Sequence, residues 1–154
     1  MMTREEIEKQ ETERQLEIIN TGDHEKVMEL TKKYLYEKAQ FALIEKGDIE
    51  SIKAYISKYS FCDDAEIVLI EKGDTEAIKA YISRYPFCEK AELALIERGD
   101  KEEIMLYIIK YELYKNSQLA LIKRGVTKEI ESYKQRYSFH NAAKTALRRK
   151  KAYK

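Results

Sequence analysis

The sequence predicts an all-α protein, namely a right-handed α-solenoid of about five short helix-turn-helix repeats followed by a C-terminal capping helix. The first observation is that all five glycines recur at intervals of 25 or 26 residues, at Gly22, Gly47, Gly73, Gly99 and Gly125. A fixed period of roughly 20–50 residues is typical of stacked repeats. The second is that the apolar residues flanking each glycine follow a helical period. The third is that no stretch alternates as a strand would.

The repeats are most similar in the second and third copies, which agree at 17 of 26 positions. The copies lie at residues 13–38, 39–64, 65–90, 91–116 and 117–141. We expect residues 1–12 to form an N-terminal cap and residues 142–154 a basic C-terminal cap helix, because terminal repeats need a polar outer face. The whole chain, 1–154, is expected to be a single repeat domain.

Each repeat is expected to begin with a helix such as Ala65–Lys72, which is apolar around most of its circumference and should be buried. Gly73 then provides the left-handed residue that ends a helix. Asp74 is a suitable N-cap for the next helix, since its carboxylate accepts hydrogen bonds from the first turn. In the fifth copy Val126 stands at the aspartate position, and we expect Thr127 to cap instead.

The second helix of each repeat is expected to be amphipathic. In the stretch from Thr75 to Tyr85, an apolar face contains Ile78, Tyr81 and Ile82 at helical spacing. Tyrosines recur in pairs four residues apart in four copies, at residues 55/59, 81/85, 107/111 and 133/137.

Composition points to no particular partner. The formal net charge is +1 although 37% of the residues are charged, which favours neither nucleic acid nor a membrane. The first residues are too polar for a signal peptide, and no apolar run approaches the ~20 residues that span a bilayer. We therefore expect a cytoplasmic protein. Cys62 and Cys88 occupy equivalent repeat positions, about one helix diameter apart, so we expect reduced thiols rather than a disulfide.

The architecture resembles the α-solenoid class of helical-hairpin repeats, which includes HEAT, tetratricopeptide and ankyrin repeats. The string Leu69-Ile70-Glu71-Lys72-Gly73-Asp74 is similar to the end of an ankyrin repeat. No named family is matched, because the 26-residue period is shorter than the ~33–47 residues of those repeats. The resemblance implies an extended, curved binding surface.

No catalytic, cofactor or metal site is expected. The two histidines, His24 and His140, stand at no metal-ligand spacing from another histidine or cysteine. A thiol enzyme would need Cys62 or Cys88 within ~3 Å of His140, whereas equivalent positions two repeats apart are separated by ~20 Å. All glycines are assigned to helix ends, so none remains for a phosphate loop. The sequence thus favours a non-catalytic protein.

The favoured function is protein–protein interaction, as an adaptor, inhibitor or scaffold. Most second helices carry polar residues along one stripe, but the fourth copy has the apolar pair Met105 and Ile109 there. Exposed apolar clusters often mark interaction sites. The candidate partner-binding residues are Glu50, Lys53, Lys79, Ser83, Met105 and Ile109. The alternative is that local geometry buries the Met105/Ile109 pair in the core.

A second hypothesis is nucleic-acid binding by repeated basic residues. One series near the ends of the second helices, with the basic C-terminus, comprises Lys58, Arg84, Lys110, Arg136, Arg148, Arg149, Lys150 and Lys151. Another series, just before the glycines, comprises Lys46, Lys72, Arg98 and Arg124. Cations are favoured at helix C-termini by the helix dipole alone, and that explanation stays open. Binding to phosphates predicts a steep salt dependence.

The ends of the chain have opposite charge. Residues 1–17 contain six glutamates against three basic residues, and residues 144–154 contain six basic residues and no acid. This polarity suits a solubilising cap at each end, and equally a head-to-tail stack of copies. Self-association through Met105 and Ile109 is a further alternative.

Overall fold

The structure, a computed structural model, describes residues 1–152, and these residues form eleven helices. The part described contains no strand, so the predicted all-α class is confirmed. The chain divides into two compact units, Met1–Tyr85 and Pro86–Lys154, and each is considered by itself.

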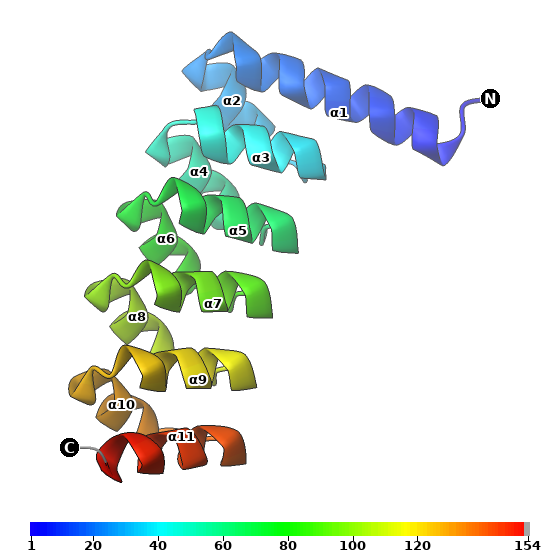
Figure 1. Ribbon diagram of the computed structural model, residues 1–154. Helices are drawn as coiled ribbons and strands as arrows, with labels where there is room; N and C mark the ends of the chain where they lie inside the picture. The colour runs from blue at the N-terminus through cyan, green and yellow to red at the C-terminus, as the bar shows by residue number, and fades with distance from the viewer. Residues whose placement is uncertain (153–154) are drawn as a thin grey trace. The chain divides into compact units, whose positions relative to one another are not determined.

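The first unit consists of three hairpins in which a first helix is followed by a shorter second helix. Its helices are α1 (Arg4–Thr21), α2 (His24–Leu30), α3 (Glu37–Lys46), α4 (Ile49–Ile56), α5 (Asp63–Lys72) and α6 (Thr75–Ile82). The first helices pack in sequence, α1 on α3 and α3 on α5, and the second helices pack likewise, α2 on α4 and α4 on α6. The two kinds of helix therefore form two layers within this unit (Figure 1).

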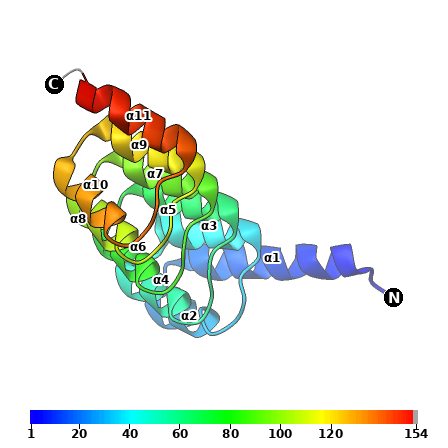
Figure 2. The ribbon, with the colours of Figure 1, turned by 90° about the horizontal axis from the view of Figure 1, so that it is seen from below.

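The second unit repeats this arrangement. Its helices are α7 (Glu89–Arg98), α8 (Lys101–Ile108), α9 (Lys115–Arg124), α10 (Thr127–Lys134) and α11 (Asn141–Ala152). Helix α9 packs between α7 and α11, while α8 packs on α10. Helix α11 occupies the place of a first helix, and residues 1–152 provide it with no second helix (Figure 2).

The glycines end four of the first helices as the sequence predicts. Gly22, Gly73, Gly99 and Gly125 have φ angles of 69 to 80°, a region that costs other residues energy. Gly47 differs, and the prediction was wrong there: its φ is −71° and its ψ is 154°. A Cβ at Gly47 would lie 2.4 Å from the carbonyl oxygen of Leu43. Lack of space, rather than a positive φ, therefore requires glycine at position 47.

Aspartate caps four of the second helices. The side chains of Asp23, Asp48, Asp74 and Asp100 each accept a hydrogen bond from the backbone N–H three residues later. The expected cap at Thr127 was wrong, because Thr127 lies inside α10 and the N-cap residue is Val126, which forms no side-chain hydrogen bond. A valine side chain has no acceptor, so the first turn of α10 lacks the contact that the aspartates provide.

The core lies between the two layers in each unit. Leucine and isoleucine from the first helices, with Ala39 and Ala65, meet isoleucine and tyrosine from the second helices, and all of these side chains are buried. The second helices end earlier than expected, as at Ile82, and Tyr85 lies half-buried in the turn that follows. Cys62 and Cys88 are reduced, half-buried thiols.

Candidate interaction surface

A buried tyrosine ties each of the second helices α4, α6, α8 and α10 to the loop that precedes its hairpin. The hydroxyl of Tyr107 accepts a hydrogen bond from the N–H of Phe87 at 3.2 Å, and that of Tyr133 accepts one from Leu113 at 3.0 Å. In the first unit, Tyr55 and Tyr81 accept from Leu35 and Phe61 in the same way. These tyrosines are at most 1% exposed, so the recurring tyrosine is a structural element and contributes nothing to the molecular surface.

A buried glutamine or glutamate on the first helices α1, α3, α5, α7 and α9 completes this network. Gln118 Oε1 accepts from the N–H of His140 at 2.6 Å, and its Nε2 donates to the carbonyl of Leu113 at 3.0 Å. Gln40 joins Cys62 and Leu35 identically. The equivalent residues recur every 25 or 26 positions, at Gln15, Gln40, Glu66, Glu92 and Gln118. Sequence reasoning missed this series, although its regular spacing was a usable signal.

Two members of the series are carboxylates. Glu92 is 1% exposed; its two oxygens accept from the Tyr107 hydroxyl at 2.7 Å and from the N–H of Tyr114 at 2.8 Å. Burial raises the pKa of Glu92, although these hydrogen bonds oppose the increase. Glu66 accepts a short hydrogen bond from Tyr81, and burial raises the pKa of that tyrosine well above its usual range. Neither carboxylate is available to a partner, because both are enclosed.

The basic residues that precede the glycines bind the ends of neighbouring first helices. The hydrogen bonds are Lys46 Nζ to Asn20 Oδ1 at 2.7 Å, Lys72 Nζ to Ile44 O at 2.7 Å, Arg124 Nη2 to Gly99 O at 3.0 Å and Lys150 Nζ to Ile122 O at 2.8 Å. Most of the acceptors are backbone carbonyls at a helix C-terminus, which carries partial negative charge. This series therefore has an intramolecular role, and Lys150 belongs to it.

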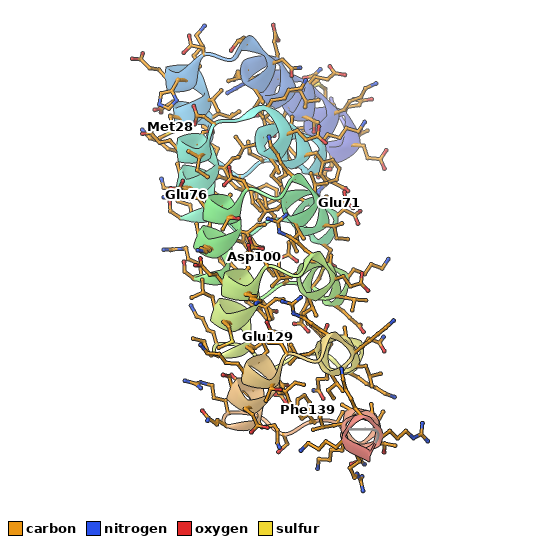
Figure 3. The ribbon with its side chains drawn as sticks, turned by 60° about the vertical axis from the view of Figure 1, so that its left-hand side comes forward. Met28, Glu71, Glu76, Asp100, Glu129 and Phe139 are labelled. Carbon is orange, nitrogen blue, oxygen red and sulfur yellow. The ribbon has the colours of Figure 1, made fainter. Side chains whose placement is uncertain are left out.

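Two arginines of that series also pair with a buried glutamate. Arg98 contacts Glu103 at 3.0 Å and Arg124 contacts Glu129 at 2.8 Å, and the glutamate side chains are at most 2% exposed. Where the series has lysine, the glutamate position holds Ser51 or Ala77. Within the described residues, Glu129 Oε2 has no hydrogen-bond partner (Figure 3 labels Glu129 on α10).

The basic residues near the ends of the second helices are less uniform. Arg84 Nη2 donates to the carbonyl of Ser57 at 2.9 Å, which is again a helix C-terminal carbonyl. The ammonium of Lys110 lies 5.6 Å from the centre of the Tyr111 ring. Lys58 and Arg136 have exposed side chains. All four residues are exposed, but Arg84 and Lys110 also make contacts within the protein.

The polar candidates of the second-helix stripe contact neighbouring side chains of the first unit. Lys53 forms an exposed ion pair with Glu76 at 2.9 Å, and Glu50 lies 3.3 Å from His24. The hydrogen bond of His24 to Asp48 raises the pKa of the histidine. Lys79 is half-buried, and the exposed Ser83 donates its hydroxyl to the carbonyl of Ala80. Exposed ion pairs of this kind contribute little stability.

The apolar candidates lie on the exposed side of α8. Ile109 is 39% exposed and Leu106 is 40% exposed, while Met105 is half-buried beside them. Ile108 is fully buried, so this helix has apolar residues on both its core face and its outer face. We call Met105, Leu106 and Ile109 the α8 cluster. Sequence reasoning named Met105 and Ile109 as the exposed pair, and the exposure of Leu106 was missed.

A groove lies along α11 in the second unit. Its volume is about 620 Å³, and its lining includes the apolar residues Tyr137, Phe139 and Leu147. Four cations line the same groove: Lys134, Lys144, Arg148 and Lys151. Phe139 lies in the loop between α10 and α11 (Figure 3). Among the described residues no carboxylate lines this groove, so these side chains give it a positive potential.

Comparison of the chain with models of known protein families, with curated proteins and with solved structures gives no match. Over residues 1–152, no helix combines the length and the apolar character that crossing a membrane requires.

Proposed function

We propose that this protein is a right-handed α-solenoid that binds another protein without catalysing a reaction, as an adaptor, inhibitor or scaffold. The observation that carries the proposal is the exposed α8 cluster. Helices α4 and α10 have polar residues at the positions of Met105 and Ile109, namely Lys53 and Ser57 in one case and Glu131 and Gln135 in the other. An exposed apolar cluster, here at positions that are polar in α4 and α10, is typical of an interaction surface.

The chemistry of the cluster indicates the kind of partner. Met105 is flexible and polarizable, so it adapts to the shape of a bound side chain. Leu106 and Ile109 offer branched aliphatic surface, and the exposed Lys101 and Glu102 stand in the first turn of the same helix. This arrangement suits a helix of a partner protein with two or three apolar side chains on one face.

The test is a comparison of partner capture by wild-type protein and by the variant Leu106→Lys/Ile109→Lys. Both side chains are partly exposed, so we expect the variant to keep its helical circular dichroism and to lose the captured partner. Purified partner and calorimetry then give the affinity. Removing two apolar contacts of this kind weakens binding by about tenfold or more.

The matched control is Glu131→Lys/Gln135→Lys, which changes the equivalent stripe on α10. This variant should bind as the wild type does. Unfolding of the α8 variant would identify the cluster as part of the core, and unchanged binding would place the interaction elsewhere; either result rejects the proposal.

Nucleic-acid binding is the second candidate, and the cations of the α11 groove are the observation that favours it. Lys134, Lys144, Arg148 and Lys151 line the groove, and Arg149 is exposed on the same helix. Fluorescence anisotropy with labelled RNA and DNA tests this function. Sub-micromolar binding at ~50 mM salt that collapses at ~200 mM salt would support it.

A further inference from the structure

Within residues 1–152, helix α11 is the one first helix that is not followed by a second helix. In the hairpins of the second unit, α7 is followed by α8 and α9 by α10, whereas residues 1–152 provide no second helix after α11. The residues lining the groove occur at helical spacing along α11, at Lys144, Leu147, Arg148 and Lys151. Lys144 of α11 is equivalent to Gln118 of α9. Gln118 Nε2 donates a hydrogen bond to the hydroxyl of Tyr133 on the second helix α10, at 3.3 Å. The groove is therefore the place that a second helix would fill.

Helix α1, at the other end of the sequence, is longer than the other helices. It contains 18 residues, whereas α3 contains 10. The repeat spacing aligns Glu37 of α3 with Thr12, so residues 4–11 have no counterpart in α3. This N-terminal segment extends past α3 in two views of the first unit (Figures 1 and 2). We call residues 4–11 the overhang; it has eight residues, as do α4, α6, α8 and α10.

The overhang has the sequence of a second helix. Its N-cap Thr3 is followed by Glu6 and Ile7 at the third and fourth helical positions, just as Asp100 is followed by Glu103 and Ile104. The isoleucine at this position is buried in the second helices α4, α6, α8 and α10, with exposed fractions of 0 to 6%. Ile7, by contrast, is 50% exposed. The overhang thus presents a half-exposed isoleucine at a position that is buried in the second helices.

We propose that the overhang of one copy occupies the α11 groove of a second copy, at the place that a second helix holds in the other hairpins. Charge supports this occupant, since the overhang contains four glutamates against Arg4 and Lys9, and the described residues that line the groove include four cations and no carboxylate. The proposal concerns self-association and does not depend on the α8 cluster.

Equivalence between repeats assigns three pairs across this contact. Gln10 stands at the tyrosine position and therefore faces Lys144, whose ammonium donates to the amide oxygen. Glu6 stands where Glu103 and Glu129 bind arginine, and it therefore faces Lys150. Lys150 already donates to Ile122 O and Lys123 O, and an ammonium has a third proton for Glu6.

The third pair is Glu11 with Arg148. Both residues occupy positions that hold buried isoleucines in the hairpin of α7 and α8, namely Ile108 and Ile96. Apolar residues have thus been replaced by opposite charges on the two sides of one contact. Because the overhang and the groove are different surfaces, the contact is head-to-tail and adds copies in sequence.

Sedimentation velocity of the full chain tests the proposal, at increasing protein concentration and at about 50 and 500 mM salt. We expect oligomers that grow with concentration and dissociate at high salt. Ile7→Lys should weaken the association by about tenfold or more and leave circular dichroism unchanged, since Ile7 is half-exposed. Tyr114→Lys, at another residue with 50% exposure, is the matched control and should associate normally.

Charge exchange identifies the contact. Glu11→Arg and Arg148→Glu should each abolish association alone, and an equimolar mixture of the two variants should restore it, because the mixture contains complementary surfaces. A protein that stays monomeric at about 1 mM, a concentration that detects even millimolar affinity, overturns the proposal. So does an oligomer that survives Ile7→Lys and is lost with Leu106→Lys/Ile109→Lys, a result that would assign self-association to the α8 cluster.

Discussion

At the scale of the residue, the buried glutamine or glutamate of the first helices α1, α3, α5, α7 and α9 is the most informative position. A glutamine amide both donates and accepts, so Gln118 binds a loop carbonyl and a loop N–H together. An ionised carboxylate only accepts. Glu92 accepts hydrogen bonds from the Tyr107 hydroxyl and the Tyr114 N–H. Burial of its negative charge nevertheless costs free energy, because the carboxylate is removed from water.

We therefore expect Glu92→Gln to stabilise the protein by about 1–2 kcal/mol at pH 7. Because the pKa of Glu92 is raised in the folded state, the wild type is most stable below the ordinary glutamate pKa of ~4.3 and loses stability as pH increases through the raised value. The glutamine side chain does not ionise, so the stability of the variant does not decrease in this way as the pH increases. Urea denaturation should thus show a difference that is small near pH 4 and larger at pH 7.

The reverse substitution, Gln118→Glu, is the matched control for Glu92→Gln. It should destabilise the protein at pH 7 and regain stability as the pH decreases. If both substitutions reduce stability equally at all pH values, then side-chain shape rather than charge determines this position.

At the scale of the element, the start of α10 is the weakest of the aspartate-type caps. Val126→Asp should stabilise the protein by about 1 kcal/mol, because the new carboxylate accepts from the first turn as Asp100 does. Asp100→Ala should cost a similar amount. Thermal denaturation followed by circular dichroism measures both changes. Val126→Ala controls for loss of the valine side chain, and a gain from Val126→Ala equal to that from Val126→Asp would contradict the capping argument.

The elements were predictable from the sequence to the extent that local rules decide them. Glycine spacing, aspartate caps and helical periodicity located the hairpins because each acts over a few residues. Local rules failed at Gly47, where the limit is the carbonyl of Leu43, and at Thr127, where register places the threonine inside α10. The sequence identified the basic series before the glycines, but the acceptors of its hydrogen bonds were out of reach, since they lie about one repeat away in sequence.

At the scale of the whole molecule, equivalent residues recur in both compact units, so equivalent substitutions should be comparable. Tyr107→Phe should cost more than Tyr133→Phe, because the Tyr107 hydroxyl donates to a buried carboxylate whereas that of Tyr133 meets only neutral groups. Hydrogen bonds to charged groups contribute about 1.5–3 kcal/mol, and neutral ones about 0.5–1.5 kcal/mol.

The changes in the free energy of unfolding caused by Tyr55→Phe and by Tyr133→Phe should also add in the double variant. The two tyrosines belong to different units and share no partner, and independent sites add to within ~0.5 kcal/mol. Equilibrium denaturation measures each value. A larger cost for Tyr133→Phe than for Tyr107→Phe, or strong non-additivity, would contradict this account.

The buried tyrosines also serve as intrinsic spectroscopic probes of unfolding. The protein contains twelve tyrosines and no tryptophan, so its near-ultraviolet absorbance is that of tyrosine alone. Enclosure raises the pKa of Tyr55 to about 12 and raises that of Tyr133 as well. In an alkaline titration these enclosed phenols therefore ionise last. The second absorbance step then records the opening of the hairpins themselves, without any attached label.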